Sequence, residues 1–238
     1  MKVLATTLGE MMGDFFSMTL NLGYVLGLGI TVAFLLFMLI IQLKATAFYP
    51  SLYWLVIVGT TTVGTEISDL MDRTLGLGYT MGSIILFTCL VSVLFLWHKR
   101  EKGIKVYPIT EPRIEIFYWI AILFSNSLGT AFGDYLSDNA GLSYLMGAAV
   151  TGAIIIFVVF LHYFSKINEI LLFWIAFIFT RPFGATFGDF LTKPLAKGGL
   201  NFGRGIASII ATCLLSILII YSSKADKKLG MKKAQAEK

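Results

Sequence analysis

The sequence predicts an all-α integral membrane protein of eight transmembrane helices. Of its 238 residues, 57% are hydrophobic and only 14% are charged, and the mean hydropathy is +0.81. A soluble chain of this length needs far more polar surface than that. The net charge of +5 comes from Lys and Arg in loops and at the C-terminus, so we expect membrane lipid, and not nucleic acid, as the partner of the basic residues.

The apolar residues fall into runs that match the thickness of a bilayer. A helix needs roughly 20 apolar residues to cross the hydrocarbon layer. Seven runs meet this requirement: 22–42, 49–70, 77–97, 115–136, 142–163, 169–190 and 202–222. An eighth run, 3–19, is shorter and contains two acids, so we expect it to span a locally adapted bilayer. Partial insertion of this run, with seven spans, is the alternative.

Basic residues in the loops indicate the orientation. The side that carries both termini has most of them: Lys2, Lys44, Lys99, Arg100, Lys102, Lys105, Arg113, Lys166 and the tail from Lys224 onward. The other side has only four: Arg73, Lys193, Lys197 and Arg204. We therefore expect both termini in the cytoplasm, and residues 223–238 as a solvated, partly disordered basic tail with affinity for anionic lipid.

A short phrase occurs four times along the chain and indicates an internal repeat. The copies are GEMMGD at 9–14, GTEISD at 64–69, GTAFGD at 129–134 and GATFGD at 184–189. In the last three copies a Trp precedes the Asp by 15 residues, at Trp54, Trp119 and Trp174, where we expect the cytoplasmic interface. Small residues spaced by four begin the next helix: Gly23/Gly27, Gly78/Gly82, Ser143/Gly147 and, after a one-residue insertion, Gly199/Gly203. These features predict four copies of a two-helix hairpin.

The spacing of the copies groups them in two pairs. Successive Asp residues are 55, 65 and 55 positions apart, which predicts a first repeat pair at 1–104 and a second at 105–222, joined by the loop 98–113. Because each copy holds two helices, all four copies point the same way through the membrane. The predicted arrangement is therefore a pseudo-rotation of parallel repeats about the membrane normal, unlike the inverted repeats of many transporters.

Four tandem copies of G-x-x-x-[GS]-D, with Trp in the first helix of three, resemble a bacterial family of tandem-repeat membrane proteins of unknown function. Its members are described as uncharacterised membrane-anchored proteins. The likeness covers the chain except for its tail, and the first copy departs by lacking the Trp. The resemblance implies a bacterial inner membrane protein but carries no activity.

Repeat symmetry places four acids at one depth, in the outer half of the membrane. They are Asp14, Asp69, Asp134 and Asp189. Glu10 and Glu66 lie one helical turn earlier, and we expect them on the same face as the Asp of their repeat. Three polar residues extend this face inward as auxiliary groups: Thr6, Thr61 and Asn126. Arg181 is the one deeply placed base, and we expect it to pair with an acid from another copy.

Six ionised acids and one base would leave about five uncompensated negative charges in a low-dielectric interior, which is too costly to persist. Protonation, bound cations or a water-filled vestibule would relieve this charge, and crowded carboxylates share protons. We therefore expect a transporter or exporter of a small cation, coupled to protons. The four Asp would bind the cation, and oxygen ligands suit Mg²⁺, Mn²⁺, Ca²⁺ or Na⁺. No other cofactor is implied.

Two other functions stay open. The acids could lock helices together in a non-transporting module that binds a lipid or a partner protein, since small residues favour close helix packing. They could also form the selectivity ring of a cation channel. Self-association into a homo-oligomer is open as well. Enzyme activity is not expected, because the sequence has no Ser–His–Asp set, phosphate loop or His-rich metal motif.

Overall fold

The computed structural model describes residues 1–45, 47–104, 109 and 111–236. Within this part of the chain there are eight α-helices and no strand. The helices are α1 (Lys2–Asp14), α2 (Gly23–Lys44), α3 (Pro50–Asp69), α4 (Gly78–Glu101), α5 (Pro112–Asp134), α6 (Tyr144–Phe164), α7 (Glu169–Thr192) and α8 (Arg204–Ala236). Short π-helical segments follow three of them, η1 (Phe15–Thr19), η2 (Leu70–Thr74) and η3 (Tyr135–Asn139), and the 3₁₀ turn η4 (Leu195–Lys197) precedes α8. The predicted count of eight helices is confirmed.

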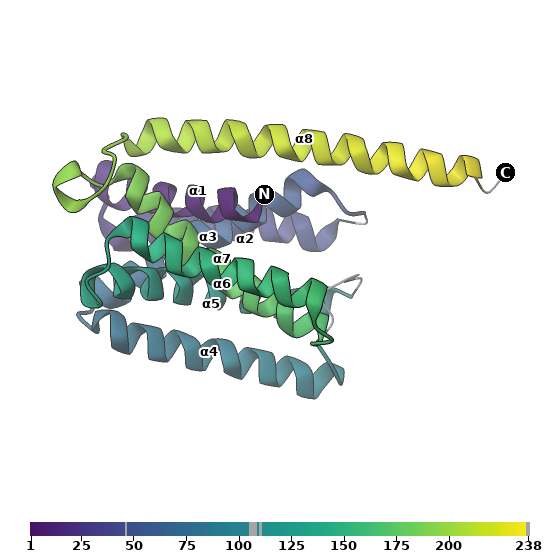
Figure 1. Ribbon diagram of the computed structural model, residues 1–238, viewed down its shortest axis with the longest axis horizontal. Coiled ribbons are helices and arrows are strands. Elements are labelled where there is room, and N and C mark those ends of the chain that lie inside the picture. The colour runs from purple at the N-terminus through teal and green to yellow at the C-terminus, as the bar shows by residue number, and fades with distance from the viewer. Residues whose placement is uncertain (46, 105–108, 110, 237–238) are drawn as a thin grey trace.

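The first helices of the four repeats form an inner ring. In this ring α1 contacts α3 and α7, and α5 also contacts α3 and α7. Each second helix packs on the first helix of the following repeat: α2 on α3, α4 on α5, α6 on α7, and α8 back on α1. Figure 1 shows the helices side by side along one direction, with α8 along one edge of the bundle. The repeats therefore interlock in a closed cycle.

Six of the eight helices are long and apolar enough to cross a membrane, namely α2, α4, α5, α6, α7 and α8. The other two, α1 and α3, are inner-ring helices. The outer helices cover them, so their sequences need fewer apolar residues; Thr60, Thr61, Thr62 and Thr65 of α3 are all buried. Large apolar side chains such as Ile156 of α6 and Ile209 of α8 are exposed, as lipid-facing residues are. The chain is a membrane protein.

The first glycine of each repeated phrase faces the next helix of the ring. Gly9 lies against Thr61, Gly64 against Asn126, Gly129 against Arg181 and Gly184 against Thr6. A Cβ atom at Gly129 would stand 2.4 Å from Cγ of Arg181, and one at Gly9 would stand 2.0 Å from Oγ1 of Thr61. The phrase is thus a packing seam between inner helices, as small residues permit.

The fourth repeat differs in register from the sequence prediction. Each outer helix buries residues spaced by four against the inner ring. In α2 these residues include Gly27 and Thr31, and in α8 they include Ala207 and Ala211. The small pair of the fourth repeat is therefore Gly203/Ala207, not Gly199/Gly203. The insertion is larger than one residue, because Gly203 follows its Asp by 14 positions whereas Gly23 follows its Asp by nine. The inserted residues form η4 and its turn.

The last helix extends into the basic tail. Helix α8 continues from the apolar segment through Ala236. Of residues 225–236, four are Lys and three are Ala, which favour a helix, and Gly230 is the one residue among them with a low helix propensity.

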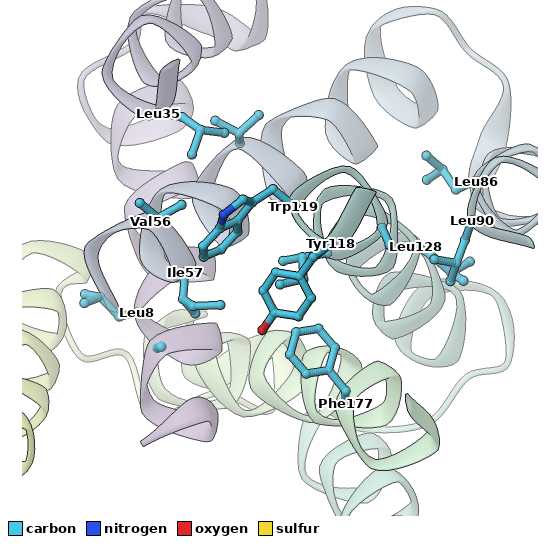
Figure 2. Close-up of a cluster of buried hydrophobic side chains, with 14 of the residues drawn as sticks. Leu8, Leu35, Val56, Ile57, Leu86, Leu90, Tyr118, Trp119, Leu128 and Phe177 are labelled. Carbon is cyan, nitrogen blue, oxygen red and sulfur yellow. The ribbon is translucent and has the colours of Figure 1, made fainter. Parts of the chain in front are cut away.

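Aromatic side chains close the end of the ring opposite the repeated Asp residues. The hydroxyl groups of Tyr53 and Tyr118 are 2.7 Å apart, and the Lys2 ammonium lies 2.6 Å from the centre of the Phe177 ring. Figure 2 shows Tyr118 and Phe177 facing one another between the helices. Trp119 of the same cluster is only 3% exposed. Trp119 and Trp174 therefore belong to the protein interior, whereas Trp54 is half-buried.

Replacing Gly129 with Ala should destabilise the ring, because the new methyl group would overlap Arg181 at a position packed on all sides. We expect a loss of about 1–3 kcal/mol, the usual cost of overpacking, measured as a lower Tm in detergent. Gly29 of α2 is the matched control, since a Cβ atom there meets nothing within 4 Å. An equal fall in Tm for Gly29→Ala would contradict this account.

Candidate functional site

Arg181 lies at the centre of the inner ring. It is 0% exposed, and one of its Nη atoms forms an ion pair with Glu10 Oε2 at 3.0 Å. The guanidinium also donates hydrogen bonds to all three other inner helices, to the carbonyl oxygens of Thr6 and Thr61, each at 3.1 Å, and to the hydroxyls of Thr65 and Thr130. The prediction that this base pairs with an acid from another copy is confirmed.

The position of Arg181 follows from the repeat. It occupies the place held by Thr6, Thr61 and Asn126 in the other copies, three residues before the first glycine. Its side-chain partners Glu10, Thr65 and Thr130 all come from the position directly after that glycine. One repeat therefore directs its cation to the equivalent position of the three others, which places the guanidinium between all four inner helices.

The auxiliary residues form a polar layer around this cation. Thr6 donates to the carbonyl oxygen of Thr180 at 3.3 Å, and Thr61 donates to that of Ala5 at 3.2 Å. The Asn126 amide donates to the hydroxyl of its neighbour on α3, Thr60, at 3.1 Å. Each bond joins two neighbouring inner helices, so these groups mainly connect the ring.

The four repeated acids meet at the C-terminal ends of the inner helices. Asp14, Asp69, Asp134 and Asp189 are all buried. Arg73 joins two of them, with its Nε 3.0 Å from Asp69 Oδ1 and its Nη2 3.2 Å from Asp134 Oδ2. Asp69 and Asp134 are therefore brought together, with a cationic side chain between α3 and α5.

Lys193 makes the equivalent bridge on the other side of the ring. Its Nζ is 3.0 Å from Asp14 Oδ2 and 3.1 Å from Asp189 Oδ1, so it joins α1 to the end of α7. Arg204, at the start of α8, also reaches Asp14 Oδ2 at 3.2 Å. All four Asp side chains thus contact at least one base.

These three bases were predicted to be loop residues outside the site. The signal that could have found two of them is spacing, because Arg73 and Lys193 each follow a repeated Asp by four positions and so share its helix face. Glu10 and the four Asp now face four bases: Arg73, Arg181, Lys193 and Arg204. Counted over these nine side chains in their ionised forms, the net charge is minus one, and not the minus five expected from the sequence.

Glu66 does not join the acids, which corrects its predicted place. It lies between α3 and α2, where Thr31 donates a hydrogen bond to its Oε2. The reason is helical phase. Glu10 is the second residue of the repeated phrase and Glu66 the third, and one position turns a side chain by about 100° around a helix.

A metal site at the four Asp has no support in this geometry. Among the described residues, no group of three or more His, Cys, Asp or Glu side chains is placed to hold a metal ion. The ammonium and guanidinium groups occupy the positions between the carboxylates that a hard cation was expected to take. These side chains supply the positive charge instead.

A double-mutant cycle should separate the pair at the centre. Arg181→Thr restores the residue type of Thr6 and Thr61 but leaves Glu10 buried without its cation, at an expected cost of about 3–5 kcal/mol. Adding Glu10→Thr, the residue type of Thr65 and Thr130, should recover much of this loss. The measurement is thermal unfolding of the two single variants and the double variant. Additive losses would contradict the direct pairing.

Comparison with known proteins agrees with the repeat. The family model described as Repeat of Unknown Function (DUF347) matches the chain four times, at residues 1–48, 52–102, 117–168 and 172–228. No curated protein and no solved structure matched the chain. Each match covers most of one inner helix and of the outer helix that follows it. The chain therefore belongs to the DUF347 repeat family, with four copies of the repeat in one polypeptide.

Proposed function

We propose that this protein is a membrane carrier that exchanges a small cation for protons at the buried acids of the inner ring. The observation that carries the proposal is the charge of the site, in which five carboxylates share four bases. An uncompensated charge in a buried site must be neutralised. One bound proton or one monovalent cation neutralises it, so the two compete for the same place.

The charge count also favours one kind of cation. A monovalent ion such as Na⁺ brings the site to neutrality, whereas Mn²⁺ or Mg²⁺ would leave it positive while Arg73 and Lys193 remain in contact with the Asp side chains. Among the ions that the sequence left open, we therefore favour a monovalent one. Carboxylates, hydroxyls and carbonyls are suitable oxygen ligands for it.

Polar layers follow the axis of the ring from the Asp side chains inward. The first is the Asp layer, and the second contains Glu10 and Arg181. Beyond them, the aromatic cluster around Tyr118 and Phe177 closes the axis. A carrier needs a closed side at any moment, and movement of this cluster would open it. The guanidinium on the axis opposes continuous flow of cations, which favours a carrier over a channel.

We place the protein in the bacterial inner membrane with all eight helices spanning it and both termini in the cytoplasm. The C-terminal ends of the four inner helices meet at the Asp layer, which supports four parallel repeats around an axis along the membrane normal. The outer helices shield α1 and α3, which supports their insertion in spite of their polar residues. In this orientation the Asp layer faces away from the cytoplasm.

A second candidate is a non-transporting module that binds a lipid or a partner protein. The observation in its favour is that Arg73 and Lys193 each join the ends of two inner helices. The same ion pairs would also hold the inner helices together in a protein that transports nothing. The two candidates differ in whether loss of one acid removes ion movement or only stability.

Asp134→Asn should abolish Na⁺-driven proton movement in proteoliposomes, because the site loses the charge that binds the proton or cation. Asp138→Asn is the control, since Asp138 is exposed and accepts a hydrogen bond from Tyr79 at 3.0 Å. Both variants should elute from size-exclusion chromatography as the wild type does. Under the structural alternative, the wild type moves no cation under any gradient and Asp134→Asn lowers the Tm.

The exchange should be electroneutral, because one proton and one monovalent cation replace one another at a site of constant net charge. Clamping the membrane potential with K⁺ and valinomycin should leave the exchange rate unchanged, while a pH gradient should change it. A rate that rises steeply with the potential would contradict the one-for-one exchange.

A further inference from the structure

Glu66 is a buried acid away from the axis, and its charge has no counterpart. Its side chain is 0% exposed, and its Oε1 has no hydrogen-bond partner. In the part of the chain whose side chains are described, no Lys, Arg or His forms an ion pair with it. Its one polar contact is the hydrogen bond that Thr31 donates to Oε2. An acid buried at this depth in a membrane protein points to a functional site.

An apolar cavity lies beside this acid, between α1, α2 and α3. Its volume is about 200 Å³. Met12 and Phe16 form its wall on the side of α1 and η1, and Ile30 and Phe34 form its wall on α2. Ile30 and Phe34 are themselves exposed on the lipid-facing surface. The cavity is therefore placed for a molecule that arrives from the lipid phase.

Thr31 connects the cavity to the acid. Its hydroxyl donates to Glu66, and the residue also lines the cavity. On α3, the lining residue Thr62 precedes Glu66 by four positions and so lies on the same helix face. On α2, Gly27 precedes Thr31 by four positions, and a Cβ atom at Gly27 would stand 2.5 Å from Oε1 of Glu66. The carboxyl thus lies one helical turn beyond the end of the cavity.

We propose that this cavity binds a small lipophilic amine. The apolar body of the amine fills the cavity, and its protonated nitrogen replaces Thr31 as the donor to Glu66. The size agrees, because a dry apolar cavity of about 150 Å³ already holds a benzene-sized group. The positive charge of the amine also complements the site, since no cationic side chain pairs with the buried carboxyl of Glu66. This site is separate from the Asp layer and does not depend on the proposed exchange of cations.

The repeats show that the site is specific to this one junction. The positions equivalent to Glu66 hold Met11, Ala131 and Thr186. Thr186 packs at the same kind of junction, where a Cβ atom at Gly147 of α6 would stand 3.1 Å from its Cγ2. Replacing Glu66 with Thr therefore copies a residue that the fold already accommodates, and this makes Glu66→Thr a suitable test variant.

The test uses dicyclohexylcarbodiimide, a reagent that reaches buried carboxyl groups from lipid. The protonated carboxyl adds across one C=N bond of the reagent, its oxygen bonding to carbon and its proton moving to nitrogen. The acyl group then moves from oxygen to nitrogen and leaves a stable N-acylurea without a further reactant. Mass spectrometry of peptides should find this adduct at Glu66 in the wild type and not in Glu66→Thr.

Phenethylamine is the probe ligand, and 2-phenylethanol is its uncharged control. At ten times its Kd, phenethylamine should slow the labelling of Glu66 about tenfold by mass action, and should raise the Tm of the wild type but not of Glu66→Thr. The alcohol should do neither. Ile30→Trp, which fills the cavity from the lipid side without changing the core, should remove the effect of the amine.

Equal protection by the amine and the alcohol would overturn the proposal, because the carboxyl would then contribute nothing. An unchanged labelling rate with phenethylamine would overturn it as well. If the reagent does not label Glu66, the Tm decides: a rise in the wild type that is lost in Glu66→Thr and Ile30→Trp supports the site, and no rise overturns it.

Discussion

The buried guanidinium of Arg181 is the interaction on which the rest of the structure depends. It belongs to α7, yet every acceptor of its hydrogen bonds belongs to α1, α3 or α5. A buried guanidinium without these acceptors would be very unfavourable, so the four inner helices must meet at one height and in one register. Gly129 provides the space for its side chain. The inner ring is therefore organised around a single cation.

The charges divide the fourfold ring of helices into two halves. Arg73 joins the second and third repeats, and Lys193 joins the fourth and first. At the equivalent positions the first and third repeats have Met18 and Asp138, so the remaining two junctions lack a bridging base. Four similar helices thus carry a twofold pattern of charge. The base comes from the second and the fourth repeat, so each bridge joins one of the predicted repeat pairs to the other.

Two glutamates in neighbouring positions of the repeated phrase have different surroundings. Glu10 faces the axis and has a guanidinium as its partner, whereas Glu66 faces an outer helix and has a hydroxyl. The outer helix of one repeat covers the inner helix of the next, so a residue turned away from the axis meets α2 and the apolar cavity beside it. Repetition with small changes can therefore place two chemically distinct sites on one scaffold.

The sequence by itself determined the membrane class, the eight helices and the four repeats, because hydropathy and internal repetition are local properties of a chain. It also indicated that the four acids occupy equivalent places in the repeats and that Arg181 meets an acid of another repeat. Only the tertiary structure decided that Arg73 and Lys193 turn inward, that Glu66 turns outward and that Ala207 is buried. These directions depend on the phase of each helix and on which helix covers it. The covering helix comes from the neighbouring repeat, and the sequence pattern of one repeat does not predict which other repeat packs against it.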